Sequence, residues 1–407
     1  MGYGKLAKGM SEEQAKRKLE SVMPIQNNAK KFNGSTPPSV FIGSHNYPKP
    51  STGVLSPQHQ GDSMLMDSPD KWYSEKYSIE KVASLRTSLV NSKKQTRVKQ
   101  TDQFVDTARE IAMACKPTHV EVELDKKPFN SISAGRVKPV SASGNLKQFK
   151  LGENPSVDKQ VEKAFYDKEF QAESAMQKLY SKGVDNYTIQ QVMSTGMLGK
   201  EENRKLVPTR WSITATDDTI SSQILDDVKQ FQELGQIEYY KNSYIGNNFH
   251  IFLIPGKWEY ELLELKRPDS AWNAMKNTYI ANNYEGFSGR TEYAEQTAGA
   301  YYATKLGIME HLQQRKRQAK AIVLREVTPD YWAPLGVWVI RETVRNAFNN
   351  PEELENMEQV KWRINSNFRF LFKRIKKRSK MLDRRQSSLE SYLSTSSTSS
   401  NSSRFNT

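Results

Sequence analysis

The chain has 407 residues, 36% of them apolar, and a formal net charge of +14. This length suits one large domain or two ordinary ones plus tails, and the charge predicts a polyanionic partner. The single cysteine, Cys115, excludes an internal disulfide and a multi-thiolate zinc site. No apolar run reaches the roughly 20 residues that span a bilayer, and no apolar signal core begins the chain, so we expect a cytoplasmic protein without membrane contact.

The first third of the chain alternates loops with short helices. Residues 1–30 are expected to form a short helical segment, at 11–22, without zinc cysteines. The Gly, Pro and Ser of residues 32–72 predict a region dominated by loops. Helices are predicted at 79–89 and 102–115, the second ending before Pro117, and the alternating valines of residues 119–124 predict a half-buried strand.

The middle of the chain mixes strands and helices. Ser156 is placed to cap a helix that Gly183 ends, and residues 210–215 read as a strand before a helix from about 218 to 235. Strands at 237–245, 249–254 and 258–265 have short connections that predict hairpins. A helix at 292–314 precedes strands at 321–325 and 336–340. This order predicts an α+β fold for residues 31–350, with a mixed, largely antiparallel sheet and packed helices.

Residues 351–385 predict a long basic helix, capped by Asn350 and starting at Pro351. From residue 361 to residue 385 there are eleven Lys or Arg and one acid, Asp383. Such a face neutralises phosphates without reading sequence, although a solvated helix face would look the same. We expect DNA to contact the cations Lys373, Arg374, Lys376, Lys377, Arg378 and Lys380.

The segment 386–393 has the pattern of a peptide that docks on the DNA sliding clamp, PCNA. Leu389 and Tyr392 are three residues apart, so a tight 3₁₀ turn places them on one side as an apolar plug, next to Leu393. Gln386 remains free to hydrogen-bond at the rim. Residues 394–407, rich in Ser, Thr and Asn, predict a disordered tail that leaves the peptide accessible.

Three stretches carry a resemblance to a known family. They are 34–43 (Gly-Ser-Thr-Pro-Pro-Ser-Val-Phe-Ile-Gly), 61–73 with Gly61-Asp62 and Asp67-Ser68-Pro69, and 206–214 (Leu-Val-Pro-Thr-Arg-Trp-Ser-Ile-Thr). Together with residues 85–90 they resemble the archaeal Nre, or "novel repair", family, over most of residues 30–345. The resemblance implies a role in the response to DNA damage and a C-terminal clamp-interacting peptide. Family members often begin with a cysteine-rich zinc segment, which residues 1–30 lack, so zinc is not carried over.

Two sets of polar residues are candidates for chemistry. A phosphate or nucleotide site is conceivable in the glycine-rich stretch, because backbone amides there can cradle phosphate oxygens, but a loop that only wraps the domain is the favoured explanation. Its spacing fits neither a Walker loop nor a dinucleotide fingerprint. The candidate residues of this site are Ser35, Thr36, Gly43, Arg86, Thr209 and Arg210.

The second set is Glu264-Leu265-Lys266, whose acid, spacer, lysine order is used by one class of Mg²⁺-dependent nucleases. The same order occurs in most proteins, and no metal-binding histidine pattern or nucleophile elbow is present. We therefore assign no metal, no cofactor and no catalytic residue, and leave open whether the protein is an enzyme.

The sequence thus predicts an archaeal DNA repair protein that PCNA recruits and that holds DNA with its basic helix, associated with the nucleoid. One alternative is a repair enzyme, a metal-dependent nuclease or a nucleotide-handling enzyme, that uses the clamp only as an address. Another is a scaffold between the clamp and other repair proteins. The lesion and the oligomeric state are left undetermined.

Overall fold

The computed structural model describes residues 17–18, 20–22, 29–99, 102–129, 141–270, 273 and 275–382. The chain divides into two compact units, Met1–Glu355 and Asn356–Thr407. Two six-stranded sheets and helices α2 to α10 belong to the first unit, and α11 and α12 belong to the second. The predicted α+β class, with mixed and largely antiparallel sheets, is confirmed.

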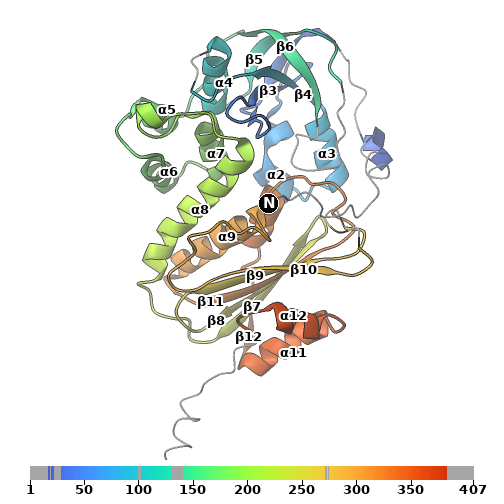
Figure 1. Cartoon of the computed structure of the whole chain (residues 1–407), viewed down its shortest axis with the longest axis vertical. Coiled ribbons are helices and arrows are strands. Elements are labelled where there is room, and N and C mark those ends of the chain that lie inside the picture. The colour runs from blue at the N-terminus through green and yellow to red at the C-terminus, as the bar shows by residue number, and fades with distance from the viewer. Residues whose placement is uncertain are drawn as a thin grey trace, which may run out of the picture. The chain divides into compact units, whose positions relative to one another are not determined.

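The first sheet closes into a small barrel (Figure 1). Its order is β1-β5-β6-β4-β3-β2, and only the β4–β6 pair is parallel. The barrel closes because the continuous segment from β1 to β2, residues 31–42, also runs beside β3. Leu55 N donates to Ser39 O (3.0 Å), and Ser35 N donates to His59 O (3.1 Å). The strands are β1 (Lys31–Thr36), β2 (Val40–Ile42), β3 (Ser51–Pro57), β4 (Leu89–Gln95), β5 (Thr118–Leu124) and β6 (Ala142–Leu151).

The second sheet has the order β10-β9-β11-β8-β7-β12. Strand β11 lies between β8 and β9, antiparallel to β8 and parallel to β9. Its strands are β7 (Ile237–Tyr244), β8 (Asn247–Ile254), β9 (Glu259–Lys266), β10 (Tyr279–Glu285), β11 (Lys320–Val327) and β12 (Glu352–Leu354). Segments far apart in sequence therefore depend on each other for their backbone hydrogen bonds.

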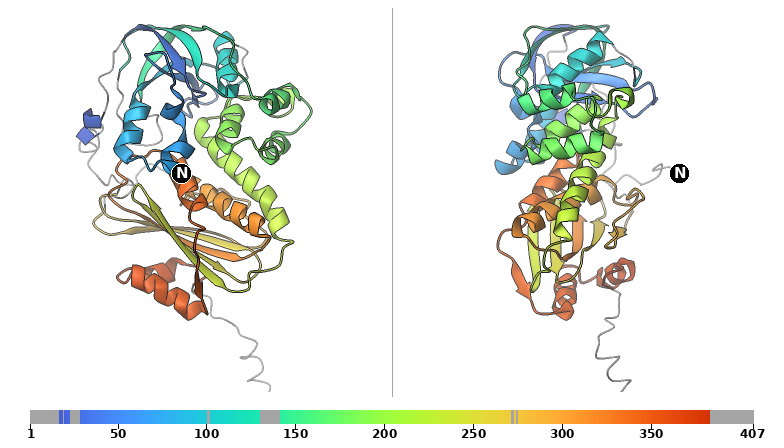
Figure 2. Two further views of the ribbon diagram at one scale, coloured as in Figure 1. Left: turned by 180° about the vertical axis from the view of Figure 1, so that it is seen from behind. Right: turned by 90° about the vertical axis from the view of Figure 1, so that its left-hand side faces the viewer.

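Helices of the first unit cover one face of the second sheet and connect it to the barrel. Helix α8 packs on α9, and α9 packs on α10 (Figures 1 and 2). A single apolar core joins the inner side of the barrel to this face. The helices are η1 (Met64–Asp67), α2 (Pro69–Ser74), α3 (Ile79–Thr87), α4 (Gln103–Met113), α5 (Lys159–Tyr166), α6 (Ala172–Ser181), α7 (Asn186–Ser194), η2 (Glu201–Asn203), α8 (Thr209–Val228), α9 (Gly299–Arg315) and α10 (Trp338–Arg345).

The second unit contains α11 (Met357–Asn367) and α12 (Phe372–Arg378). The side chain of Asn356 caps α11 by accepting the N–H groups of Glu358 and Gln359 at 3.0 and 3.1 Å. Phe368 ends this helix, and Leu371 N donates to Phe368 O at 2.8 Å in the turn before α12. The clamp peptide 386–393 and the tail 394–407 lie outside the described residues.

Several predicted elements differ from the structure in the first unit. Residues 32–72 form β1 to β3, η1 and α2 rather than loops, because barrel strands pair despite their Gly and Ser content. Residues 210–215 lie in helix α8, and residues 338–340 of the predicted strand 336–340 open helix α10. The predicted β8–β9 hairpin is wrong, since β11 separates these strands, while the β7–β8 hairpin is confirmed with its turn at Ile245 and Gly246. The helix expected after Ser156 is two helices, α5 and α6, and Asp158 caps the first.

The long basic helix expected over residues 351–385 is also wrong. Asn350 has a left-handed backbone (φ 54°), and residues 352–354 pair with β7 instead of opening a helix. The helical part begins only after Asn356 and breaks between α11 and α12. The three- and four-residue apolar spacing was correct within each helix but could not reveal the break, because the turn keeps Phe368 and Leu371 buried.

Candidate nucleic-acid interface

The cations predicted to touch DNA lie on and just after α12. Lys373, Arg374, Lys376, Lys377, Arg378 and Lys380 are all exposed, whereas Ile375 between them is fully buried. Five of the seven residues of α12 are Lys or Arg, and the other two are the half-buried Phe372 and the buried Ile375. The arrangement supplies closely spaced positive charge that can neutralise neighbouring phosphates.

Two large aromatic side chains are exposed in the same unit. Phe370 is 95% exposed in the turn before α12, and Trp362 is 61% exposed on α11. The guanidinium of Arg363 lies over the indole of Trp362, 5.2 Å from the ring centroid. Exposed aromatics among cations are the side chains that nucleic-acid binding surfaces combine.

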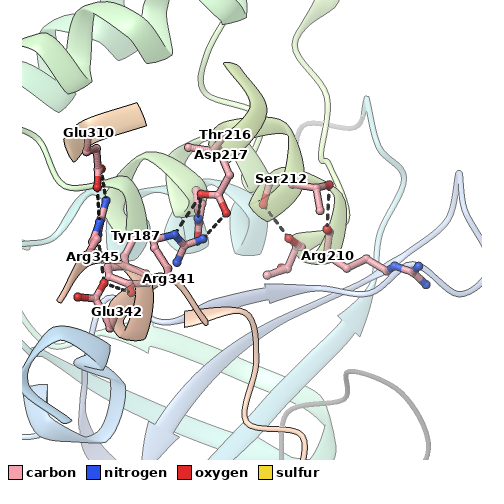
Figure 3. Close-up of polar contacts among 12 residues, drawn as sticks. Tyr187, Arg210, Ser212, Thr216, Asp217, Glu310, Arg341, Glu342 and Arg345 are labelled. Carbon is pink, nitrogen blue, oxygen red and sulfur yellow. Dashed lines mark hydrogen bonds and ion pairs between the residues drawn. The ribbon is translucent and has the colours of Figure 1, made fainter. Parts of the chain in front are cut away.

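The residues proposed for a phosphate site are only partly brought together. Thr209, the first residue of α8, accepts a hydrogen bond from Ile42 N at 2.9 Å, which places the start of α8 beside Gly43. Arg210 is exposed there, and Figure 3 shows its guanidinium extending away from the buried part of α8. The other candidates have structural contacts.

Each of those other three side chains is used inside the fold. Thr36 is fully buried and its hydroxyl donates to Leu55 O at 2.8 Å. Ser35 Oγ accepts from Gly61 N at 3.1 Å, and Arg86 pairs with Asp67 at 2.6 Å. The first two contacts hold β3 and the loop after it against β1, and the third joins α3 to η1. All three favour the structural explanation of the glycine-rich stretch over a nucleotide pocket.

Glu264 and Lys266 do meet, but inside the second sheet. Lys266 Nζ is 3.1 Å from Glu264 Oε2, Arg325 of β11 pairs with the other oxygen, and both cations are nine-tenths or more buried. Burial alone would raise the pKa of Glu264, but Lys266 and Arg325 offset it and hold that pKa below its ordinary value. A carboxylate already shared by two cations has no capacity left for Mg²⁺. The geometry therefore does not support a nuclease site here.

A second buried charge network was not predicted, and Figure 3 shows it between α7, α8, α9 and α10. Arg341 of α10 donates to both carboxylate oxygens of Asp217 of α8, at 3.2 and 2.6 Å, and Gln190 adds a hydrogen bond at 3.3 Å. The side chains of Asp217 and Arg341 are 0% and 1% exposed. Burial lowers the pKa of Arg341, but Asp217 more than offsets this, so the pKa lies above its ordinary value and the guanidinium stays charged.

The network continues on the next turn of α10. Arg345 forms two hydrogen bonds to Glu310 of α9, at 2.8 and 2.6 Å, and Glu342 accepts from Tyr187 at 2.7 Å. Burial first, and the Glu342 carboxylate with it, raises the pKa of Tyr187, so its hydroxyl stays a donor. The sequence did hold a signal for this network. Asp217 lies three residues before Ile220 on the apolar stripe of α8, where a carboxylate needs a buried partner.

Two kinds of site are absent from the part of the chain that has described coordinates. No three His, Cys, Asp or Glu side chains gather there in a way that could hold a metal ion. None of its helices is long and apolar enough to cross a membrane.

Comparison with known proteins identifies two family segments in the chain. The archaeal Nre N-terminal model matches residues 13–273, and the archaeal Nre C-terminal model matches residues 285–392. The matched region is wider than the 30–345 expected from the motifs, and it includes most of the 386–393 segment. No solved structure matches the chain.

Three curated relatives cover most of the chain. A DNA repair protein NreA of Haloferax volcanii is 46% identical over 77% of this chain and 77% of its own length. The DNA repair protein NreB of Archaeoglobus fulgidus is 37% identical over 77% of this chain and 79% of its own. NreA of the same organism is 33% identical over 88% of this chain and 90% of its own.

Proposed function

The chain belongs to the archaeal Nre family, and on that premise we propose that it acts in DNA repair, holding DNA with the cations of its second unit and docking on the sliding clamp through residues 386–393. The names of the relatives support the repair role. The single structural observation that carries the DNA contact is the set of exposed cations around the buried Ile375.

The DNA contact is electrostatic in this proposal, so it should be sensitive to salt. Each phosphate contact contributes about 0.9 to the slope of log K against log salt for B-DNA. Changing Lys373, Arg374, Lys376 and Lys377 to Gln should therefore reduce that slope by about 3 to 4 and weaken duplex binding at low salt. Fluorescence anisotropy with a labelled duplex across a salt series measures both quantities.

A charge-matched control comes from the first unit. Lys159, Lys163, Lys178 and Lys182 are exposed on or near α5 and α6, and changing all four to Gln removes the same charge. This control should retain most of the salt slope. An equal loss of slope in both variants would mean that net charge alone, not the second unit, attracts DNA, and the proposal would be wrong.

The clamp contact is tested separately. Leu389→Ala with Tyr392→Ala removes the apolar plug and should abolish binding to the purified clamp in a calorimetric titration. Ser397→Ala with Ser399→Ala alters the same tail without touching the plug and should bind as the unmodified chain does. If the plug variant binds the clamp with unchanged affinity, residues 386–393 do not recruit this protein.

A further inference from the structure

The barrel of the first unit has the strand order and directions of a known nucleic-acid-binding architecture. When the continuous segment from β1 to β2 is counted as one strand, the barrel has five strands. Around the barrel they follow in the order β1/β2, β3, β4, β6 and β5, and β5 pairs with β1. In this count β4 is the third strand along the chain and β6 is the fifth, and they form the only parallel pair of the barrel. Helix α4 connects the third strand to the fourth and packs against β2, β3 and β6. This is the topology of the OB fold, a five-stranded Greek-key barrel.

OB folds bind single strands across the second and third strands, between the first and fourth connecting loops. In this chain those strands are β3 and β4. The first loop is residues 43–50, and the fourth begins after Leu124 at residue 125. The loop 43–50 lies along the end of β4, because Thr96 N donates to Pro50 O at 2.9 Å and Val98 N donates to Pro48 O at 3.2 Å.

An exposed aromatic ring stands at the start of the fourth loop. Phe129 is 57% exposed and is held in place by two backbone hydrogen bonds with Ser143 of β6, both 3.0 Å. Lys93 of β4 places its Nζ 5.7 Å from the centre of that ring and 3.4 Å from Ser143 Oγ. A fixed ring beside an ammonium group offers a base a stacking surface and offers its phosphate a cation.

A second exposed ring stands at the first loop. Trp211 of α8 is 43% exposed and packs against Tyr47 of the loop with ring centroids 5.1 Å apart. Arg210 precedes it and is exposed. The hydrogen bond from Ile42 N to Thr209 fixes this start of α8 against the end of β2. Each of the two loops therefore has a surface aromatic and a cation near it, Trp211 with Arg210 at the first and Phe129 with Lys93 at the fourth.

The charge of this side of the barrel suits a polyanion. From residue 89 to residue 99 the chain has four cations, at positions 93, 94, 97 and 99, and no acid, and the loop 43–50 has His45 and Lys49 and no acid. One carboxylate lies beside this segment, since Asp102 Oδ2 is 2.7 Å from Lys94 Nζ, while Glu121 and Glu123 are on β5. Strand β3 is buried from residue 52 to residue 57 and β4 from residue 89 to residue 92. Apart from Ser51, the accessible part of these two strands is therefore the end of β4, residues 93–95, and the cations and exposed aromatics lie around this end.

We propose that the barrel β1–β6 binds single-stranded DNA over the accessible end of β4, residues 93–95, between the loop 43–50 and Phe129, with Phe129 and Trp211 as stacking platforms and Lys93 and Arg210 as phosphate contacts. The site is separate from the cations of α12 and goes beyond the function proposed above. It would let the protein hold an unpaired strand through the first unit while the second unit contacts duplex.

The test is fluorescence anisotropy of the full chain with a labelled oligodeoxythymidylate of about 16 nucleotides, the upper site size of one OB fold. Phe129→Ala and Trp211→Ala should each weaken binding roughly 5- to 150-fold, the usual effect of losing one stacked base. Phe129→Trp should restore binding. Tyr166→Ala, which removes an exposed aromatic (69%) of α5 paired with Phe165, should leave binding unchanged.

The two DNA sites are distinguished by exchanging variants and ligands. The Phe129 and Trp211 variants should keep duplex binding. Their weaker affinity for the single strand should persist when Lys373, Arg374, Lys376 and Lys377 are all changed to Gln. The inference is overturned if the α12-neutralised chain with Phe129 and Trp211 intact does not prefer single strand to duplex, if the unmodified chain binds an oligouridylate more tightly than the DNA, or if both aromatic variants bind like Tyr166→Ala.

Discussion

Replacing Asp217 with Asn should destabilise the first unit severely, because it leaves the guanidinium of Arg341 buried without a counter-charge. Both side chains are at most 1% exposed, and two hydrogen bonds of 3.2 and 2.6 Å join them. Removing one partner of such a pair costs about 3–5 kcal/mol, since water cannot reach the remaining charge. An asparagine oxygen can still accept one of the two bonds, so the lower part of this range is expected.

Urea denaturation followed by tryptophan fluorescence measures the effect as a difference in the free energy of unfolding. With an m-value of about 3 kcal/mol/M, a loss of about 3 kcal/mol lowers the midpoint by about 1 M. The matched control is Glu201→Gln, which breaks the exposed 2.7 Å pair with Lys168. Water screens an exposed pair, so this control should scarcely move the midpoint.

A double variant separates the charge from the packing. Asp217→Leu with Arg341→Met replaces both ions by apolar side chains and should recover most of the stability that the single change loses. The reasoning is refuted if Asp217→Asn costs no more than Glu201→Gln, or if the double variant is no more stable than Asp217→Asn alone.

Three further predictions follow from other buried contacts. Glu264→Gln should cost about 3 kcal/mol or more in urea denaturation, because Lys266 and Arg325 then share no carboxylate, while Mg²⁺ should leave the thermal midpoint of the unmodified chain unchanged. Burial lowers the pKa of His311 to about 4, so stability should fall as pH decreases from about 6.5 to 4, by up to about 3 kcal/mol, and His311→Phe should flatten this dependence. A fragment ending at residue 284 should be insoluble or unfolded by circular dichroism, because it lacks β11 and exposes the edges of β8 and β9.

Strong periodicity made part of this fold predictable. Helices α3 and α4 and strands β5, β7, β8, β9 and β11 have apolar residues at the spacing of their element, and each was predicted within a few residues. Barrel strands β1 to β3 gave no such signal, because they bury Thr36, Thr52 and Ser56 and close against glycine backbone. Their identity comes from pairing partners far along the chain, which no local pattern reports.

The candidate sites divide in the same way. The exposed cations of α12 follow from a local charge run that any fold would leave on a surface. By contrast, Asp217 and Arg341 are 124 residues apart, and Phe129 meets Lys93 only because β6 pairs with β4. A carboxylate on an apolar helix stripe indicates that a buried cation lies beside it, but only the tertiary structure identifies which cation it is.

The two family segments are interleaved rather than sequential domains. The second segment supplies β11, which lies between two strands of the first, and Arg341, which neutralises a buried carboxylate of the first. Neither segment can then satisfy its backbone edges or its buried charges alone. It follows that truncation cannot assign DNA binding to one segment, since a cut chain loses the fold together with the site. Point variants of exposed residues such as Phe129, Trp211 and Lys373, which leave both segments intact, are the changes that separate binding from folding.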